Sequence, residues 1–508
     1  MKKKTFILLG FILAKFILQY NLISPAYDLQ RDEFLQLDQG KHLAWGYISV
    51  PPVTSWISYI IQLLGKGVFW VKFFPALFGA LTMLLVWKII DLLKGNLFAL
   101  TLGLLAVLLS VMLRINILYQ PNSLDIFFWT FLYYTLIQYI HTNNTNWFFG
   151  AALAIGFGIL SKYNIVFLIL GLLPALLLTP HRNILWQKKF FISLAIAFFI
   201  VLPNIIWQFQ NDFPTISQLK ELERTQLVNV NTSAFLKDQF IYFLVAMPFI
   251  LCGFMAFFVY EPFKKYRVIF WSYLFTILLF IFFHAKSYYA AGLYPVLIAF
   301  GTVYTSHLLT NGWKRILQPF AFIWILCLGT FFISVAFPYK SPQEIEQNSQ
   351  RYKDFGLLRW EDGKDHNLPQ DFADMIGWSE LAKKVDSVYT NIPNKANTLV
   401  LCDNYGQAGA INYYSTFKNI NAVSLNADYI NWIPLDKPII NVILIQNADD
   451  DDPERKQEIP LFTRVSLVGE NTNPYSREIG TKIYLLAGAK TNINAILLQE
   501  INKYKAGY

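Results

Sequence analysis

Long apolar runs alternate with short polar segments through the first two thirds of the chain, and the pattern changes after about residue 337. A run of about 20 mostly apolar residues is long enough to cross a lipid bilayer as a helix. We predict about 11 or more such helices; an odd number puts the two ends of this region on opposite sides of the bilayer. The predicted spans are residues 5–23, 68–87, 97–113, 124–140, 147–160, 164–179, 190–208, 239–260, 268–283, 288–309 and 317–336.

The first apolar run follows Lys2, Lys3 and Lys4 and fits either a signal peptide or a first membrane helix. It is long for the core of a signal peptide, and it ends in Ser24 and Pro25 without a clear small-residue cleavage site. We therefore predict a retained membrane helix.

The composition supports a polytopic membrane protein. Of the 508 residues, 55% are hydrophobic and only 15% are charged, whereas soluble domains average about 25% charged residues. These values exclude a disordered chain, a collagen-like chain and a disulfide scaffold. Cys252 and Cys327 lie inside apolar runs and Cys402 stands alone, so we predict neither a disulfide nor a cysteine-based metal site.

The net charge of +9 comes largely from short basic clusters between the apolar runs. That pattern is typical of cytoplasmic membrane loops, so we predict no nucleic-acid partner. With the N-terminus in the cytoplasm, the denser clusters fall inside, among them Lys264, Lys265 and Arg267. We therefore predict a multi-pass membrane protein whose C-terminal part lies outside the cytoplasm.

The C-terminal part, residues 338–508, is polar and charged, and we predict that it forms a soluble α/β domain separate from a membrane domain at residues 1–337. Short apolar runs predict strands, and two longer segments predict helices. The predicted strands are residues 398–401, 439–445, 464–468 and 482–486, and the predicted helices are residues 378–389 and 493–504.

The first outer segment, residues 24–67, is too long for a simple turn and carries adjacent carboxylates at Asp32 and Glu33. Its apolar spacing predicts a helix that lies on the membrane surface, with the two acids near its start. Helix capping and solvation would also account for an acidic pair at this position.

Three further sites place ionisable groups beside apolar runs. Each has a simple structural explanation: a charge at a helix N-terminus, a lysine that extends to the interface, or an interfacial aromatic belt. The predicted topology nevertheless places all of them at the same aqueous boundary as the acidic segment. The residues are Asp125 in the first site, Lys162 and Tyr163 in the second, and His284, Lys286, Tyr288 and Tyr289 in the third.

Two acidic and two cationic sites at one face fit the transfer of a sugar from a lipid-linked phosphate. Breaking the bond between sugar and phosphate releases an anion, which fixed cations stabilise. Lys286 and Lys162 are the candidates for this role. The incoming hydroxyl group loses its proton to a carboxylate, for which Asp32 is the first choice and Glu33 the second. The prediction requires Asp32 and Lys286 to converge in one cavity.

The motifs around these residues resemble those of bacterial polyprenyl-phosphate-sugar glycosyltransferases of the GT-C superfamily, to which protein O-mannosyltransferases and the lipid A aminoarabinose transferase also belong. In the first outer segment the similar strings are Arg31–Phe34, His42–Tyr47 and Pro51–Pro52. The later similar strings, in the same order as in the family, are Ser123–Asp125, Ser161–Tyr163, Lys286, Tyr288–Tyr289, Leu293–Pro295 and Asn404–Ile411.

The resemblance implies a helical GT-C enzyme of the inner membrane, with its active site at the periplasmic face and a polyprenyl-phosphate sugar as donor. It gives the acidic role to Asp32, with Glu33 beside it, and phosphate contacts to Lys286. We assign Lys162, Tyr288 and Tyr289 to the same phosphate. The residues expected to support the site are Asp125, His42, Tyr163 and His284.

Two positions qualify this resemblance. Val50 stands where relatives often have a histidine before the proline pair, so a divalent cation is possible but no metal ligand is assigned. Asn404–Gln407 is predicted as a strand followed by a glycine turn, with no catalytic part and acceptor binding as the alternative.

The leading hypothesis is a transferase that moves a sugar from a polyprenyl phosphate to a lipid-linked glycan, lipid A or a protein. The rival is a transporter or flippase, because many apolar spans with a few charges also describe a carrier. A carrier would place its ionisable groups near the bilayer midplane and often show repeated halves, whereas here they gather at one face. A noncatalytic scaffold is the third alternative.

Overall fold

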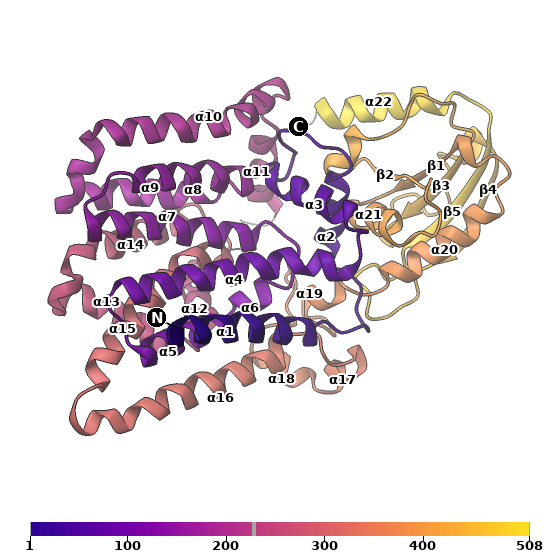
Figure 1. The fold of residues 1–508 in the computed structure, drawn as a ribbon. Coiled ribbons are helices and arrows are strands. Elements are labelled where there is room, and N and C mark those ends of the chain that lie inside the picture. The colour runs from indigo at the N-terminus through magenta and orange to yellow at the C-terminus, as the bar shows by residue number, and fades with distance from the viewer. Residues whose placement is uncertain (1, 226–229, 507–508) are drawn as a thin grey trace.

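The structure, a computed structural model, describes residues 2–225 and 230–506. It consists of a bundle of long helices and a smaller C-terminal region built around a sheet (Figure 1). This arrangement confirms the predicted fold class, a mostly helical chain with a C-terminal α/β part.

Each predicted span contains a helix of the bundle. One span, residues 239–260, is divided between two helices, α12 and α13, which meet at an angle of 101°. The bundle helices are α1 (Lys2–Asn21), α4 (Val68–Leu92), α5 (Leu97–Leu108), α7 (Asn122–Thr142), α8 (Trp147–Ser161), α9 (Ile165–Leu177), α10 (Lys188–Gln210), α12 (Thr232–Tyr242), α13 (Met247–Val259), α14 (Arg267–Phe282), α15 (Tyr294–Leu309) and α16 (Gln318–Ala336).

Fewer helices meet the criteria for a membrane span than belong to the bundle. Within the described ranges, six helices are long and apolar enough to cross a membrane, or eight if each of two bent pairs forms one span. Helices α5 and α8 are apolar but shorter. The expected number of crossings therefore stays a prediction.

Figure 1 shows the N-terminus at the end of the bundle that is remote from the sheet. There the Lys4 ammonium lies 2.5 Å from the Asp91 carboxylate, which ties the start of α1 to the end of α4. Short 3-10 helices connect several bundle helices: η1 (Pro180–Trp186), η3 (Glu261–Tyr266) and η5 (Gly312–Leu317).

Short helices form the layer between the bundle and the sheet, and α2, α3 and α19 are visible there in Figure 1. Helix α2 confirms that the acidic segment is helical. Seven of its nine residues are buried, and the C-terminal region covers it; its position at the membrane surface stays a prediction. The short elements are α2 (Arg31–Gln39), α3 (Val53–Leu63), α6 (Met112–Ile115), α11 (Pro214–Thr225), η4 (Ser287–Leu293), α17 (Pro342–Gln347), α18 (Ser349–Asp354) and α19 (Gln370–Ala373).

The C-terminal sheet has five strands in the order β2-β1-β3-β5-β4. Strand β1 pairs in parallel with β2 and β3, while β5 pairs antiparallel with β3 and β4. The four predicted strands are confirmed within a few residues, whereas the three-residue β2 was missed. The strands are β1 (Thr398–Cys402), β2 (Ala422–Ser424), β3 (Asn441–Gln446), β4 (Phe462–Glu470) and β5 (Lys482–Ala489).

Alternate side chains of the central strands serve two different cores. Leu399 and Leu444 face α22 on one side of the sheet, while Val400 and Ile443 face α20 and α21 on the other. This second core extends beyond the C-terminal region to Phe34 of α2 and neighbouring outer helices. A continuous apolar core therefore fixes the C-terminal region against the acidic helix. The remaining elements are α20 (Trp378–Thr390), η6 (Lys395–Asn397), α21 (Tyr405–Tyr414), η7 (Ala427–Asn431), η8 (Ile459–Leu461) and α22 (Ile493–Ala506).

The prediction of a strand and glycine turn at residues 404–407 was wrong, because these residues begin helix α21. The Asn404 side chain accepts hydrogen bonds from the backbone N–H groups of Gly406 and Gln407, at 2.9 and 3.1 Å. The Gln407 side chain in turn accepts from the Asn404 backbone. This reciprocal cap satisfies N–H groups that the first helical turn leaves without partners.

Candidate active site

The first turn of α2 directs its two acids to different surroundings. Successive residues of a helix are about 100° apart around its axis. As a result Asp32 faces the C-terminal region and Glu33 faces the bundle. Gln30 caps the helix by accepting from the Asp32 backbone N–H at 2.9 Å, and both carboxylates lie where the helix dipole favours negative charge.

Asp32 is half-buried and accepts one side-chain hydrogen bond on each oxygen. The Tyr405 hydroxyl donates to Oδ1 at 2.6 Å, and the Gln120 amide donates to Oδ2 at 3.1 Å. A carboxylate oxygen has lone pairs for more than one donor. Asp32 therefore keeps the capacity to accept a proton from a further group.

Glu33 is completely buried, and its carboxylate is saturated with donors. The Lys72 ammonium lies 2.6 and 2.7 Å from its two oxygens. The backbone N–H of Tyr119 donates to Oε1 at 2.7 Å and that of Gln30 to Oε2 at 2.8 Å. This geometry joins α2, α4 and the segment before α7, and it suits a structural role better than proton transfer.

Lys162, at the C-terminal end of α8, faces the two predicted tyrosines. Its ammonium lies 4.2 Å from the centre of the Tyr289 ring and 5.0 Å from that of Tyr288. Two aromatic faces at these distances stabilise a cation. The ammonium also donates to Asn122 Oδ1 at 2.8 Å.

A row of hydrogen bonds connects Asp32 to Lys162. Gln120 donates to Asp32, Asn122 donates to Gln120 Oε1 at 2.8 Å, and Lys162 donates to Asn122. The row crosses from α2 to the start of α7 and then to the end of α8. The structure thus brings together the first-choice acid and one of the two predicted phosphate-binding lysines.

Lys286, the residue before η4, points toward the C-terminal region. Its ammonium lies 3.2 Å from Glu361 Oε1, and both side chains are partly exposed. Burial acts to raise the pKa of Glu361, but Lys286 and a hydrogen bond from Gln370 outweigh that effect and lower it. Burial raises the pKa of Tyr288 well above its ordinary value, and the Asp32 and Glu361 carboxylates add to this effect. The convergence of Lys286 and Asp32 in one cavity stays a prediction.

Of the two predicted supporting residues Asp125 and Tyr163, only Asp125 is connected to the tyrosine pair. Asp125 is buried and accepts from Trp129 at 2.7 Å and from Asn164 at 2.8 Å. Asn164 also donates to the backbone carbonyl of Tyr289 at 2.9 Å. Asp125 therefore holds η4 in place, whereas the Tyr163 hydroxyl turns away to α10, where it donates to Asn204 at 3.0 Å.

The two histidines lie apart from this group. His42 follows the far end of α2 and stacks on Trp432, with ring centres 4.2 Å apart. Burial in this position lowers the pKa of His42 despite the nearby Asp38 carboxylate. His284 is exposed at the end of α14, with a left-handed backbone (φ 50°).

The sequence-based prediction missed several charged residues near the site. Lys72 is embedded in the apolar run of α4, where an ionisable residue is a signal in its own right. Arg114 ends another apolar run; its guanidinium is buried, 3.6 Å from Asp371, and its terminal nitrogens have no hydrogen-bond partner among the described residues. Glu361 belongs to a polar loop, where sequence offers no comparable signal.

Charges of the C-terminal region also surround the acidic helix. Asp374 accepts from Arg477 at 3.1 and 3.2 Å, and its backbone carbonyl accepts from the Arg31 backbone at 3.1 Å. Burial raises the pKa of Asp374 to about 7, although Arg477 and Arg31 act in the opposite direction. The cluster therefore binds the segment before α20 to the first turn of α2.

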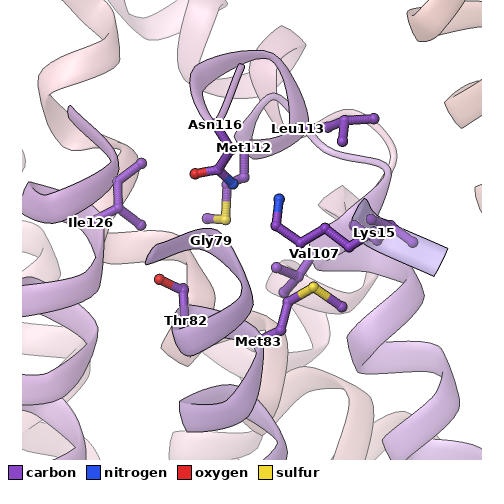
Figure 2. A pocket seen from close by; sticks show the side chains of 10 residues that line it. Lys15, Gly79, Thr82, Met83, Val107, Met112, Leu113, Asn116 and Ile126 are labelled. Atoms are coloured by element: carbon purple, nitrogen blue, oxygen red, sulfur yellow. The ribbon is translucent and has the colours of Figure 1, made fainter. Parts of the chain in front are cut away.

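A further buried cation, Lys15, lies in α1. Figure 2 shows its ammonium pointing toward a small cavity that Thr82 and Asn116 also line. The ammonium donates to Gln19 at 3.0 Å. The centre of a water molecule could move within a volume of about 10 Å³ in this cavity, which is the lower limit for holding one buried water. It is lined by none of the predicted site residues.

A divalent cation has no evident place in this arrangement. No group of three or more His, Cys, Asp or Glu side chains within residues 2–225 and 230–506 is arranged to hold a metal ion. Of the two acids in the first turn of α2, Glu33 is already neutralised by Lys72. The side chains around Asp32 thus do not form a metal site, and the mechanism proposed below uses only protein groups.

The chain resembles known glycosyltransferases over part of its length. Residues 49–207 match the family described as dolichyl-phosphate-mannose-protein mannosyltransferase. The chain is 25% identical over 231 residues to the lipid A galacturonosyltransferase RgtD of Rhizobium johnstonii, covering 44% of this chain and 47% of RgtD. It is 26% identical over 218 residues to the lipopolysaccharide core galacturonosyltransferase RgtB of the same organism, covering 41% and 44%. It therefore matches less than half the length of either relative.

The fold is similar to that of ArnT from Cupriavidus metallidurans. The structure of ArnT bound to undecaprenyl phosphate superimposes with a TM-score of 0.59, covering 94% of this chain and 97% of ArnT at 12% identity. The apo structure gives a TM-score of 0.60. The likeness thus extends over both the bundle and the C-terminal region.

Proposed function

We propose that this chain, a glycosyltransferase of the GT-C superfamily, transfers a sugar from a polyprenyl phosphate to a hydroxyl group of an extracytoplasmic acceptor. The observation that carries the proposal is the row of hydrogen bonds from Asp32 to Lys162. It joins a carboxylate suited to accept a proton to a cation suited to a phosphate. The similarity to ArnT, whose structure contains undecaprenyl phosphate, supports a polyprenyl-phosphate donor.

The reaction needs one proton acceptor and one anion site. The acceptor oxygen forms a bond to the anomeric carbon as the bond from that carbon to the phosphate oxygen breaks. The acceptor proton moves to Asp32, and the electron pair of the broken bond leaves with the phosphate. A positioned base contributes about 10²–10⁴-fold to such a step, and fixed cations stabilise the departing charge.

Lys162 and Lys286 hold the phosphate in this proposal, with Tyr288 and Tyr289 beside it. Lys162 is already oriented by Asn122 and the two rings. Lys286 must exchange its partner Glu361 for the phosphate, and the partial exposure of both side chains leaves room for that exchange. Glu33 acts through position: its ion pair with Lys72 holds the turn that carries Asp32.

We place the reaction at the outer face of the inner membrane, with the N-terminus in the cytoplasm. The density of basic residues in the alternating loops supports this orientation. Lipid A, a lipid-linked glycan and a protein remain the acceptor classes. The names of RgtD and RgtB make lipid A and the lipopolysaccharide core the first acceptors to assay.

The test uses the full chain, purified and placed in lipid nanodiscs with radiolabelled undecaprenyl-phosphate sugars and each acceptor class. Asp32→Asn is expected to lower transfer at least about 100-fold, with the thermal midpoint close to that of the unchanged chain. Lys286→Ala is expected to raise the donor KM. Matched controls are Asp212→Asn, in the turn between α10 and α11, and Lys220→Ala, on α11; both residues are exposed, and both variants should leave transfer intact.

The alternatives predict different results. Unchanged turnover in Asp32→Asn and Lys286→Ala would refute the site. A purified chain without transfer, whose Asp32→Asn variant still supports sugar transfer in whole membranes, would be a scaffold. If the sugar stays on its lipid under all conditions while a solute or lipid crosses proteoliposomes, the chain is a carrier.

A further inference from the structure

We propose that Tyr405, in the C-terminal region, is a positioning residue that holds the Asp32 carboxylate ready to take the acceptor proton. This inference rests on the proposed function and extends it to a second region of the chain. It gives a role to the residues Asn404–Ile411, for which the sequence indicated no catalytic part. The C-terminal region thereby completes the active site rather than only covering it.

The hydrogen bond between Tyr405 and Asp32 is short and joins two distant parts of the chain. The phenol donates to Oδ1 at 2.6 Å across 373 sequence positions. Hydrogen bonds from O–H to a carboxylate are shorter and stronger than those between neutral groups. With Gln120 on the other oxygen at 3.1 Å, the plane of the carboxylate is fixed from two sides.

The start of α21 explains why a tyrosine can reach α2. A Cβ atom on Gly406 would lie 2.7 Å from Cγ of Arg31, and one on Gly409 would lie 2.5 Å from Cβ of Phe34. Both distances are too short for a methyl group, so these glycines allow the two helices to pack closely. The Asn404 cap fixes the start of α21 at this point of contact.

The charges around the contact keep the phenol protonated. Burial and the Asp32 carboxylate raise the pKa of Tyr405 well above its ordinary value, against the opposing effect of Arg31. The guanidinium of Arg31 lies 4.3 Å from the centre of the Tyr405 ring. Tyr405 therefore acts as a donor over the whole working pH range, and the ring is held between the cation and the carboxylate.

Other groups also influence Asp32. Arg31 precedes it on α2, Tyr288 approaches from η4, and Asp374 lies in the segment after α19. None of them donates a hydrogen bond to the Asp32 side chain among the contacts of the described residues. Removing the Tyr405 hydroxyl thus changes one donor to Asp32 while the other groups stay in place.

Tyr405→Phe removes the hydroxyl but keeps the ring against Arg31. A hydrogen bond to a charged acceptor stabilises the ionised carboxylate over its protonated form. Its loss is expected to move the acid limb of the pH profile of kcat/KM upward by about one to two pH units. At the optimum, kcat is expected to fall about 10-fold because the carboxylate is less well oriented.

Tyr413→Phe is the matched control on the same helix. The Tyr413 hydroxyl donates to the backbone carbonyl of Lys66 at 2.9 Å, so this change also removes a bond between the two regions but does not touch Asp32. Its pH profile is expected to match that of the unchanged chain. If Tyr405→Phe lowers activity uniformly, with the same acid limb, Tyr405 is only structural and the inference fails.

A double-mutant cycle on the thermal midpoint tests the contact even where transfer is lost. Tyr405→Phe is expected to lower the midpoint clearly in the unchanged chain and much less in Asp32→Asn. Equal shifts in both backgrounds would overturn the inference. Absence of sugar transfer by the unchanged chain would instead refute the proposed function, so the two failures are distinguishable.

Discussion

Glu33 and Lys72 form an ion pair that is almost completely closed to solvent, with side-chain exposures of 0% and 2% and a shortest distance of 2.6 Å. Asp32, the neighbour of Glu33, is paired with neutral donors and partly open. The two adjacent acids therefore have opposite surroundings. The ion pair of Glu33 anchors helix α2, whereas the partly exposed Asp32 can accept a proton from a substrate.

Removing the charge of only one partner of the buried pair Glu33–Lys72 should destabilise the protein strongly. Lys72→Met leaves Glu33 as an uncompensated buried charge, a change that costs about 3–5 kcal/mol. In Glu33→Gln plus Lys72→Met no charge is left unpaired, so the double variant should lose less than the sum of the single losses. Thermal midpoints in detergent measure this, and additive losses would contradict it.

Removing the carboxylate that competes for Lys286 should improve donor binding. Glu361→Gln keeps the shape of the side chain but releases the cation for phosphate. The pair is partly exposed, and such pairs contribute about 0.2–1 kcal/mol. The donor KM is therefore expected to fall about 1.5- to 5-fold. Glu261→Gln, whose exposed pair with Lys264 adjoins the start of α14, is the control; an unchanged or higher KM for Glu361→Gln would contradict the prediction.

Asp428 should make the stability of the C-terminal region depend on pH. It is buried, and burial raises its pKa from 3.8 to about 6 even though Ile48 and Gln39 donate to it. Between these values the folded protein holds a proton that the unfolded chain has released. Stability from this group is therefore present below about pH 4 and falls as pH rises toward 6.

Asp428→Asn tests this dependence because the amide carries no charge. The Oε1 atom of Gln39 has no hydrogen-bond partner among the described residues, so rotation of its amide provides an acceptor for the new N–H group. The gain of the variant over the unchanged chain should grow from pH 4 to 7, to at most about 3 kcal/mol. Thermal midpoints across this range measure it; a constant difference, like that expected for the exposed Asp436→Asn, would count against it.

Adding a methyl group between α2 and α21 should separate the two helices. In Gly409→Ala the new Cβ would lie 2.5 Å from Phe34 Cβ and 2.7 Å from the Tyr429 hydroxyl. Overpacking of this kind costs about 1–3 kcal/mol, so both the thermal midpoint and transfer should fall. Gly10→Ala, with no atom within 4 Å of the new group, should leave both values unchanged; equal behaviour of the two variants would contradict the packing described here.

Periodicity predicted most elements of the fold because each apolar run is a local property. The strand at Thr398–Cys402 and the helix at Trp378–Thr390 were predicted nearly residue by residue. Helix α21 was not, since Tyr405 and two glycines favour a turn by local preference. Its reciprocal cap at Asn404 and its close packing on α2 outweigh that preference.

The candidate site was predictable where a charged residue lies in or beside an apolar run. Lys162 interrupts an apolar stretch, and Asp32 and Lys286 lie in outer segments that adjoin predicted spans; charge beside a membrane span needs a reason. Tyr405 and Glu361 lie in polar sequence, where an aromatic or acidic residue is ordinary. Nothing local distinguishes them from their neighbours.

The sequence by itself determined the fold class, the positions of the bundle helices and the acidic segment between the first two of them. These features follow from hydrophobic periodicity and charge, which are local properties of the chain. Only the tertiary structure decided which acid of the pair is open, since Lys72 reaches Glu33 from a different helix. It also decided that Tyr405 meets Asp32. Contacts between distant segments depend on how helices pack, and no single segment contains that information.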